Sequence, residues 1–300
     1  IAGNFGSIGW HIFAIVLTFV VMNAGISAGI ERANKIVMPL FFFLFVGLAI
    51  FVATIPGSEA GYEFLFSPDW SALADPKTWM YALGQAFFSL SLAGCGTIVY
   101  GSYLKNDTDI VFSGVMVAVF ELIASILVAL TILPAVFAFG IDPQSGPPLI
   151  FITLPSIFAQ LPYSQILAIV FFLAVFFAGI TSLVNLYETP IEALQEQFGL
   201  SRIASCVVVF GFSLLVGIFL ENGDTVSSWM DIFTIYIMPV GALLAGIMFF
   251  WICGKGFAAS QIEMGSKYRV GRFIEGLGKY VYCGVTIIVL ILGVVFGGIG

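Results

Sequence analysis

Long apolar stretches recur along the chain, and most polar positions fall in the short segments between them. The longest approach or exceed the roughly 20 residues that a helix needs to cross the hydrocarbon core of a bilayer. They do not alternate apolar and polar residues in steps of two, which favours helices over a membrane barrel. The sequence therefore predicts eight transmembrane helices, at about residues 8–28, 36–55, 78–104, 108–139, 163–194, 201–220, 226–253 and 276–298.

Composition supports a membrane protein over a water-soluble one. The 300 residues are 60% hydrophobic and only 9% charged, against roughly 25% charged in a typical globular domain. So few polar groups cannot cover a soluble globule, and the predicted class is an all-α membrane protein solvated by the lipid bilayer. The net charge of −7 argues against nucleic acid as a partner, and a single histidine leaves little basis for a His-based metal or acid–base site.

The positions of lysine and arginine predict the orientation. Short basic loops stay on the cytoplasmic side, and one topology places nine of the ten cations there, with only Lys77 outside. We therefore expect a multi-pass protein of the cell (inner) membrane whose N-terminal end is external. The chain opens on Ile1 without a signal peptide, and we expect it to begin within a longer protein.

The stretch 142–162, expected outside, is too short and too proline-bounded to span the membrane, yet its middle is apolar. We expect a short helical hairpin or lid on the external face. A plain surface loop is the alternative, although it would expose an apolar patch to water.

The predicted helix 78–104 carries polar and small residues at its centre, including Gln85, Ser89, Ser91, Ala93 and Gly94. Small residues in a membrane helix often only allow close helix packing. Hydroxyls combined with glycines also suit an unwound break whose freed backbone groups face a cavity. We favour the break.

Two further groups stand out within apolar stretches. Glu121 lies midway along 108–139, where a carboxylate by default marks an ion or proton pathway; a protonated Glu bonded to a neighbour is the alternative. Ala178, Thr181 and Ser182 place one carbonyl and two hydroxyls within about a turn, a set of oxygens that suits a hard cation such as sodium. The hydroxyls could instead bond back along their own helix.

The chain resembles the neurotransmitter:sodium symporter family, in particular bacterial amino-acid transporters of the leucine-transporter type. The resemblance rests on GISAGIERANKIVMP, GQAFFSLSLAGCGTIVYGSYL, DTDIVFSG, FITLPSIF, FFAGITS and LSR, in the family's order and spacing. It implies a partial leucine-transporter-type inverted-repeat fold. The eight helices, one of them discontinuous, look like the family's helices four to eleven, and helices one to three are missing partners of the site.

By this resemblance, the sodium ligands match Ala178, Thr181 and Ser182 for one site, and Ser89 with Glu121 for the other. Substrate would contact one set of residues from the broken helix and another from 163–194: Phe88, Ser91, Leu92, Ala93, Gly94, Ser182 and Leu186. Phe88 resembles an aromatic lid and Asp231 an external-gate acid, although the sequence alone favours a solvated helix-start residue for Asp231.

Two departures from the family pattern change the expected chemistry. Gly94 stands where relatives often carry a large side chain, so we expect an enlarged pocket for a large apolar or aromatic amino acid. Glu121, with Ser125 and Gln85, is expected to supply the negative charge that chloride supplies elsewhere, so that transport does not require chloride.

The resemblance implies a sodium-coupled symporter that imports an amino acid with one or two sodium ions. The rivals are a non-transporting amino-acid sensor on the same fold and a proton-coupled transporter that uses Glu121. A membrane-bound enzyme has least support, because no nucleophile and base occur at plausible spacing. A homodimer is left open.

Overall fold

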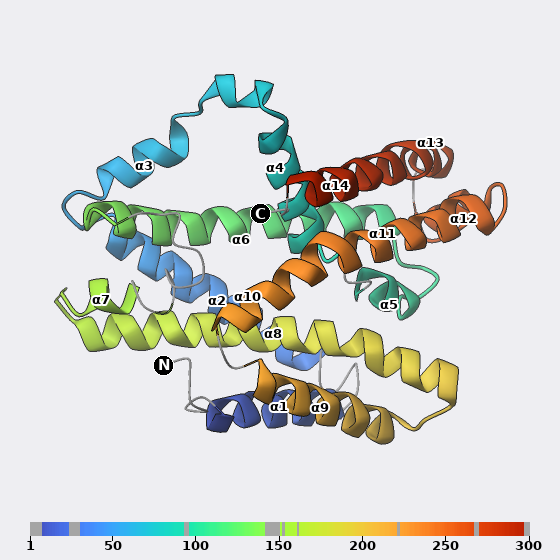
Figure 1. Cartoon of the computed structure of the whole chain (residues 1–300), viewed down its shortest axis with the longest axis horizontal. Helices are drawn as coiled ribbons and strands as arrows, with labels where there is room; N and C mark the ends of the chain where they lie inside the picture. The colour runs from blue at the N-terminus through green and yellow to red at the C-terminus, as the bar shows by residue number, and fades with distance from the viewer. Residues whose placement is uncertain are drawn as a thin grey trace. The chain divides into compact units, whose positions relative to one another are not determined.

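The computed structural model describes residues 8–23, 31–92, 96–141, 151, 154–160, 162–220, 223–266 and 270–296. Within these ranges all regular structure is helical (Figure 1). The chain divides into two compact units, the first formed by residues 1–23, 71–119 and 184–300, the second by residues 24–70 and 120–183.

The predicted apolar stretches coincide with helices. In chain order these are α1 (Ile8–Asn23), α2 (Glu31–Val52), α4 (Pro76–Ser89) with α5 (Gly96–Ser102), α6 (Ile110–Ala138), α8 (Ser164–Phe198), α9 (Arg202–Phe219), the run α10 (Gly223–Ile232), η4 (Phe233–Ile237), α11 (Met238–Ile247) and η5 (Met248–Ile252), and the run α13 (Gly271–Gly276), η6 (Leu277–Tyr282) and α14 (Cys283–Phe296). Between them lie the short helices α3 (Glu59–Phe66), η2 (Trp70–Ala74), α7 (Leu154–Phe158) and α12 (Phe257–Glu263).

Five of the described helical segments are long and apolar enough to cross a membrane, and a sixth is added if Met238–Ile252 and Phe257–Glu263, bent by 100° at their junction, count as one. The two other predicted helices are shorter for different reasons. Helix α1 is described over 16 residues, and the predicted helix 78–104 is broken into pieces of 14 and 7 residues.

Side-chain caps fix where several of these helices begin. Asp75 accepts a 2.9 Å hydrogen bond from the backbone N–H of Lys77, with Pro76 at the first position of α4. The Asp109 carboxylate accepts from the N–H of Phe112 at 3.0 Å, and the Ser201 hydroxyl accepts from Ala204 at the start of α9. The starts of α4, α6 and α9 are thus encoded locally.

The second unit has an aromatic and aliphatic core. Phe45 of α2, Val136 of α6 and Phe171 of α8 are buried there, with the Phe45 and Phe171 rings 6.1 Å apart. Helix α7 adds Leu154 and Ile157, which are 1% and 0% exposed. The apolar middle of 142–162 is therefore a short buried helix where it is described, and most of its remaining residues lie outside the described part.

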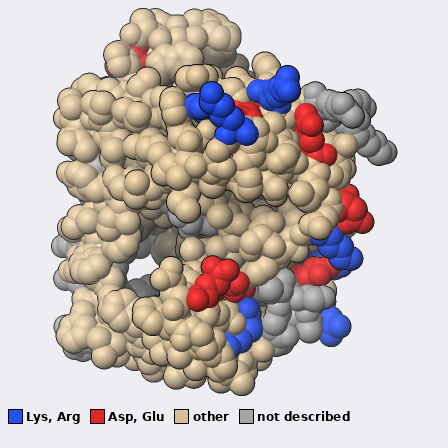
Figure 2. Space-filling view, turned by 90° about the vertical axis from the view of Figure 1, so that its right-hand side faces the viewer, with Lys and Arg blue, Asp and Glu red and all other residues tan. Residues whose placement is uncertain are grey.

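In the first unit, α1 packs on α9, and α12 packs on α13. Helix α14 packs on both α4 and α11. Large apolar side chains also remain on the outside, among them Phe112 and Phe212, which are 61% and 68% exposed. Figure 2 shows few charged side chains set in a broad uncharged surface. Such a surface is suited to lipid rather than to water.

Gly61 of α3 lies against the backbone of Pro134 in α6. A Cβ at Gly61 would lie 2.4 Å from the Pro134 Cα, and backbone atoms cannot move aside as a flexible side chain can. We expect Gly61→Ala to lower the free energy of unfolding of the full-length protein by about 1–3 kcal/mol. Gly47→Ala is the matched control, because a Cβ at Gly47 meets no atom within 4 Å; equal unfolding curves for the two variants would contradict the prediction.

Candidate substrate and ion sites

The helix predicted at 78–104 is interrupted. Helix α4 ends at Ser89, and the following backbone turns, with the N–H of Ser91 donating to the carbonyl of Phe88 at 3.0 Å. Ser91 adopts a φ of +53°, which is uncommon for a residue other than glycine. The predicted break is thus present in the described residues; Ala93 and Gly94 lie outside them.

The side chains at the break face different surroundings. Phe88 is 53% exposed and Gln85 is exposed, whereas Ser89 is half-buried. Leu92 packs against the small cluster of Phe87, Ala242 and Val289. Phe88 is therefore accessible to a ligand, whereas Leu92 packs within the first unit.

Two more residues that were predicted to take part in the substrate site or its gate belong to the first unit but lie on other helices. Leu186 of α8 is 55% exposed, so its side chain is accessible to a ligand or to another segment. Asp231 is in the last turn of α10, and its side chain lies outside the described part.

The predicted sodium ligands of α8 lie within one turn in the second unit. The Thr181 side chain is 3% exposed, and its hydroxyl donates to the Ala178 carbonyl at 2.9 Å. Ser182 beside it is exposed. The back-bond considered as an alternative is thus formed, but it uses only the hydroxyl hydrogen and leaves oxygen lone pairs free for a cation.

Glu121 has a partner on its own helix. The Ser125 hydroxyl donates to a carboxylate oxygen of Glu121 at 2.8 Å, one turn apart on α6. Both residues belong to the second unit, and a bond to a neighbour fits either the predicted carboxylate or the alternative of a protonated Glu. Gln85, predicted beside it, belongs to the first unit.

A buried ion pair that the sequence analysis did not single out lies in the first unit. Glu188 of α8 is 0% exposed, and both its oxygens accept hydrogen bonds from the Arg202 guanidinium, at 3.0 and 2.9 Å. Two parallel charge-assisted bonds of this kind are the strongest geometry for an arginine–carboxylate pair.

Further bonds extend this ion pair to other segments. Arg202 Nε donates to the Met22 carbonyl at 3.0 Å. The Tyr103 hydroxyl lies 2.9 Å from oxygens of both Glu188 and Glu192. The network joins α8 and α9 to the end of α1 and to the residue just after α5.

One signal in the sequence pointed to this network. Glu188 lies inside the predicted helix 163–194. A carboxylate within an apolar membrane helix by default marks a functional or paired group, and this applies to Glu188 as it does to Glu121.

Comparisons with known proteins agree with this arrangement of helices. A model of the sodium:neurotransmitter symporter family matches residues 2–297. An uncharacterized sodium-dependent transporter of Haemophilus influenzae is 31% identical over 289 residues, which cover 93% of this chain and 63% of that protein. The sodium- and chloride-dependent glycine transporter 2 of Xenopus laevis is 27% identical over 315 residues, covering 97% of this chain and 39% of that protein.

The crystal structure of MhsT in complex with L-phenylalanine matches with a TM-score of 0.86 and 30% identity, covering 97% of this chain and 68% of that one. The chain spans less than two thirds of the length of the two transporters matched by sequence. The predicted leucine-transporter-type fold is confirmed, and so is the expectation that the chain is not an enzyme, because the family consists of secondary transporters. The chain belongs to the sodium:neurotransmitter symporter family.

Proposed function

We propose that the protein imports an amino acid together with sodium by alternating access. The observation that carries this proposal is the interruption after Ser89, with Ser91 in the left-handed region, inside a stretch predicted to cross the membrane. Backbone polar groups freed in the membrane are tolerated only where they face a cavity or a ligand. Discontinuous helices of this kind form the substrate and ion sites of this transporter fold.

We assign one or two sodium ions to the protein. Ala178, Thr181 and Ser182 form the better supported half-site, because they lie within about one turn of α8 and the Thr181 hydroxyl donates to the Ala178 carbonyl. Ser89 and Glu121 are assigned to a second sodium ion by the family resemblance alone, and upstream helices would complete both sites. Each sodium ion contributes about 2.3 kcal/mol per 100 mV of membrane potential to uptake. As the sequence predicts, the protein would lie in the cell (inner) membrane with its N-terminal end external.

The substrate would be a large apolar or aromatic amino acid bound near Phe88 and Ser91. The similarity to MhsT in complex with L-phenylalanine supports this class. Gly94 in the same segment has no side chain to fill the site. Phe88 and Asp231 would act at the external gate, and Leu186 as an apolar wall.

A Gly94→Phe variant tests the enlarged pocket. We expect it to lose uptake of tryptophan and phenylalanine at least tenfold while uptake of alanine or glycine is retained or gained, because the added ring fills the space a large side chain needs. Competition by a panel of amino acids against a radiolabelled substrate measures the profile. An unchanged profile would contradict the assignment.

A Glu121→Gln variant tests the source of negative charge beside sodium. The wild-type protein is expected to transport equally well in chloride and in gluconate, whereas the variant lacks the carboxylate and should be at least tenfold faster in chloride. Gln keeps the shape and the bond with Ser125, so the comparison isolates the charge. Chloride-dependent uptake by the wild-type protein would refute the assignment.

Uptake by the full-length protein in proteoliposomes tests the proposed function itself. An inward sodium gradient should drive accumulation of the amino acid, and replacement of external sodium by choline should abolish it. Accumulation driven by a pH gradient in choline would show proton coupling through Glu121 instead. Sodium-dependent binding without accumulation would show a sensor.

A further inference from the structure

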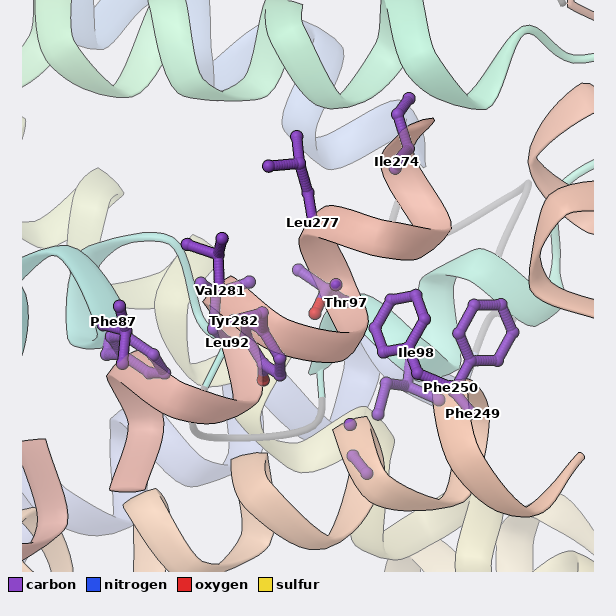
Figure 3. Close-up of a pocket in the computed structure, with 14 residues that line it drawn as sticks. Phe87, Leu92, Thr97, Ile98, Phe249, Phe250, Ile274, Leu277, Val281 and Tyr282 are labelled. Carbon is purple, nitrogen blue, oxygen red and sulfur yellow. The ribbon is translucent and has the colours of Figure 1, made fainter. Parts of the chain in front are cut away.

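An apolar cavity of about 520 Å³ lies within the first unit, whereas the proposed sodium ligands of α8 belong to the second unit. Figure 3 shows Phe249, Phe250 and Ile98 on one side, Phe87 on the other, and Thr97 between them. The volume falls in the range of about 300–1,000 Å³ typical of small-ligand sites. The cavity is therefore large enough for one bound molecule or part of one.

The lining offers almost no partner for a polar ligand. Among the described lining residues only Thr97 and Tyr282 carry side-chain hydroxyls, and the Tyr282 hydroxyl already donates to the Ala242 carbonyl at 3.1 Å. A zwitterionic amino acid buried here would lose its hydration without replacement hydrogen bonds. The lining instead suits a hydrocarbon chain.

Part of the wall comes from two π-helical segments, η5 and η6, a form of helix that often marks functional sites. Gly278 of η6 lies directly beneath the ring of Phe250, and a Cβ there would come within 2.1 Å of the ring. Because Gly278 has no side chain, the Phe250 ring can lie directly against the backbone of η6.

An amphipathic cluster adjoins the lining residues Phe250, Gly278 and Val281 in sequence. Lys279 follows Gly278, and its Nζ lies 4.3 Å from the centre of the Trp251 ring. Trp251 also meets Tyr280 edge-on at 5.8 Å. Tryptophan, tyrosine and lysine gathered in this way are typical of the boundary between lipid tails and headgroups.

The surrounding segment is basic. Residues 255–279 hold five of the ten cations in the chain, Lys255, Lys267, Arg269, Arg272 and Lys279, against two carboxylates. Both carboxylates have backbone partners: Glu275 accepts from Gly256 and Ala259, and Glu263 accepts from Gly271. A cluster of cations next to a membrane helix attracts anionic lipid headgroups.

We propose that this cavity binds an acyl chain of an anionic phospholipid, whose headgroup phosphate is held by Lys279. The apolar lining selects the chain, and Lys279 selects the charge. Because sequence places the same segment on the cytoplasmic side, the lipid would come from the inner leaflet.

Trp251 provides a local reporter for the test. In the full-length protein with every other tryptophan replaced by phenylalanine, Trp251 fluorescence is measured in vesicles that contain phosphatidylglycerol or phosphatidylcholine brominated on the acyl chain. Brominated phosphatidylglycerol should quench with an apparent affinity about fivefold higher, as expected for one cation near the surface. Equal quenching by the two lipids would overturn the proposal, as would no quenching by either.

Matched variants separate the two parts of the site. Lys279→Gln should remove the preference for phosphatidylglycerol, whereas Lys77→Gln, on the predicted external side, should keep it. Ala245→Phe places a ring in the cavity and should reduce quenching by both lipids, with each variant normalised to its own unquenched fluorescence. A preference that survives both Lys279→Gln and Ala245→Phe would show headgroup attraction without a bound chain and overturn the proposal.

Discussion

Arg202→Met is expected to lower the free energy of unfolding of the full-length protein by about 3–5 kcal/mol, the range found when one partner of a buried ion pair is removed. The reason is that Glu188 is 0% exposed and that both oxygens of its carboxylate accept hydrogen bonds from the Arg202 guanidinium. Methionine fills much of the same volume but leaves the carboxylate buried with the Tyr103 hydroxyl as its remaining contact in the network.

The exposed pair of Lys35 and Glu31 provides the control. Its side chains are 72% and 52% exposed, so Lys35→Met should change the free energy of unfolding by at most about 1 kcal/mol. Denaturant titration of both variants in the same detergent measures the difference. Similar losses in the two variants would show that burial does not set the strength of the Glu188–Arg202 pair.

A double variant distinguishes an unpaired charge from a lost contact. Glu188→Leu combined with Arg202→Met removes both charges, and we expect it to recover most of the stability lost in Arg202→Met alone. No recovery would mean that the network stabilises the protein chiefly through its bonds to Met22 and Tyr103.

The spans of this protein were predictable because they depend on local sequence. A run such as Ile110–Ala138 is apolar throughout, and the Asp109 cap before it marks its start. The interruption after Ser89 was also predictable, since two serines and two glycines within the eight residues 89–96 weaken a helix that the surrounding apolar residues favour.

The Glu188 network was not predicted because its members are distant in sequence. Tyr103 lies 85 residues from Glu188, and Arg202 stands at the start of the next helix, where a cation is ordinary on the predicted cytoplasmic side. The position of Glu188 inside an apolar stretch was a signal by itself, but nothing in the sequence identified its partners. Only the fold brings these groups together.

Thr181→Val is expected to raise the sodium concentration for half-maximal uptake by about tenfold or more. Valine has nearly the same shape, so the loss is that of one hydroxyl oxygen in a buried position. An interaction of a polar group with a charge contributes about 1.5–3 kcal/mol, which corresponds to roughly 10- to 150-fold in affinity. The measurement is uptake by full-length protein in proteoliposomes over a range of sodium concentrations, with choline keeping the ionic strength constant.

Thr131→Val is the matched control for this effect. Thr131 is also buried, at 2% exposed, lies in the same unit, and its hydroxyl likewise donates to a carbonyl of its own helix, that of Leu127 at 2.9 Å. Both variants lose a back-bond, and Thr131→Val also loses a 3.5 Å contact with the Phe45 carbonyl, so it should lose at least as much stability. Only Thr181→Val removes an oxygen assigned to sodium. If the two variants required the same sodium concentration, the Thr181 hydroxyl would have a structural role alone, and the cation would have to be held by other oxygens.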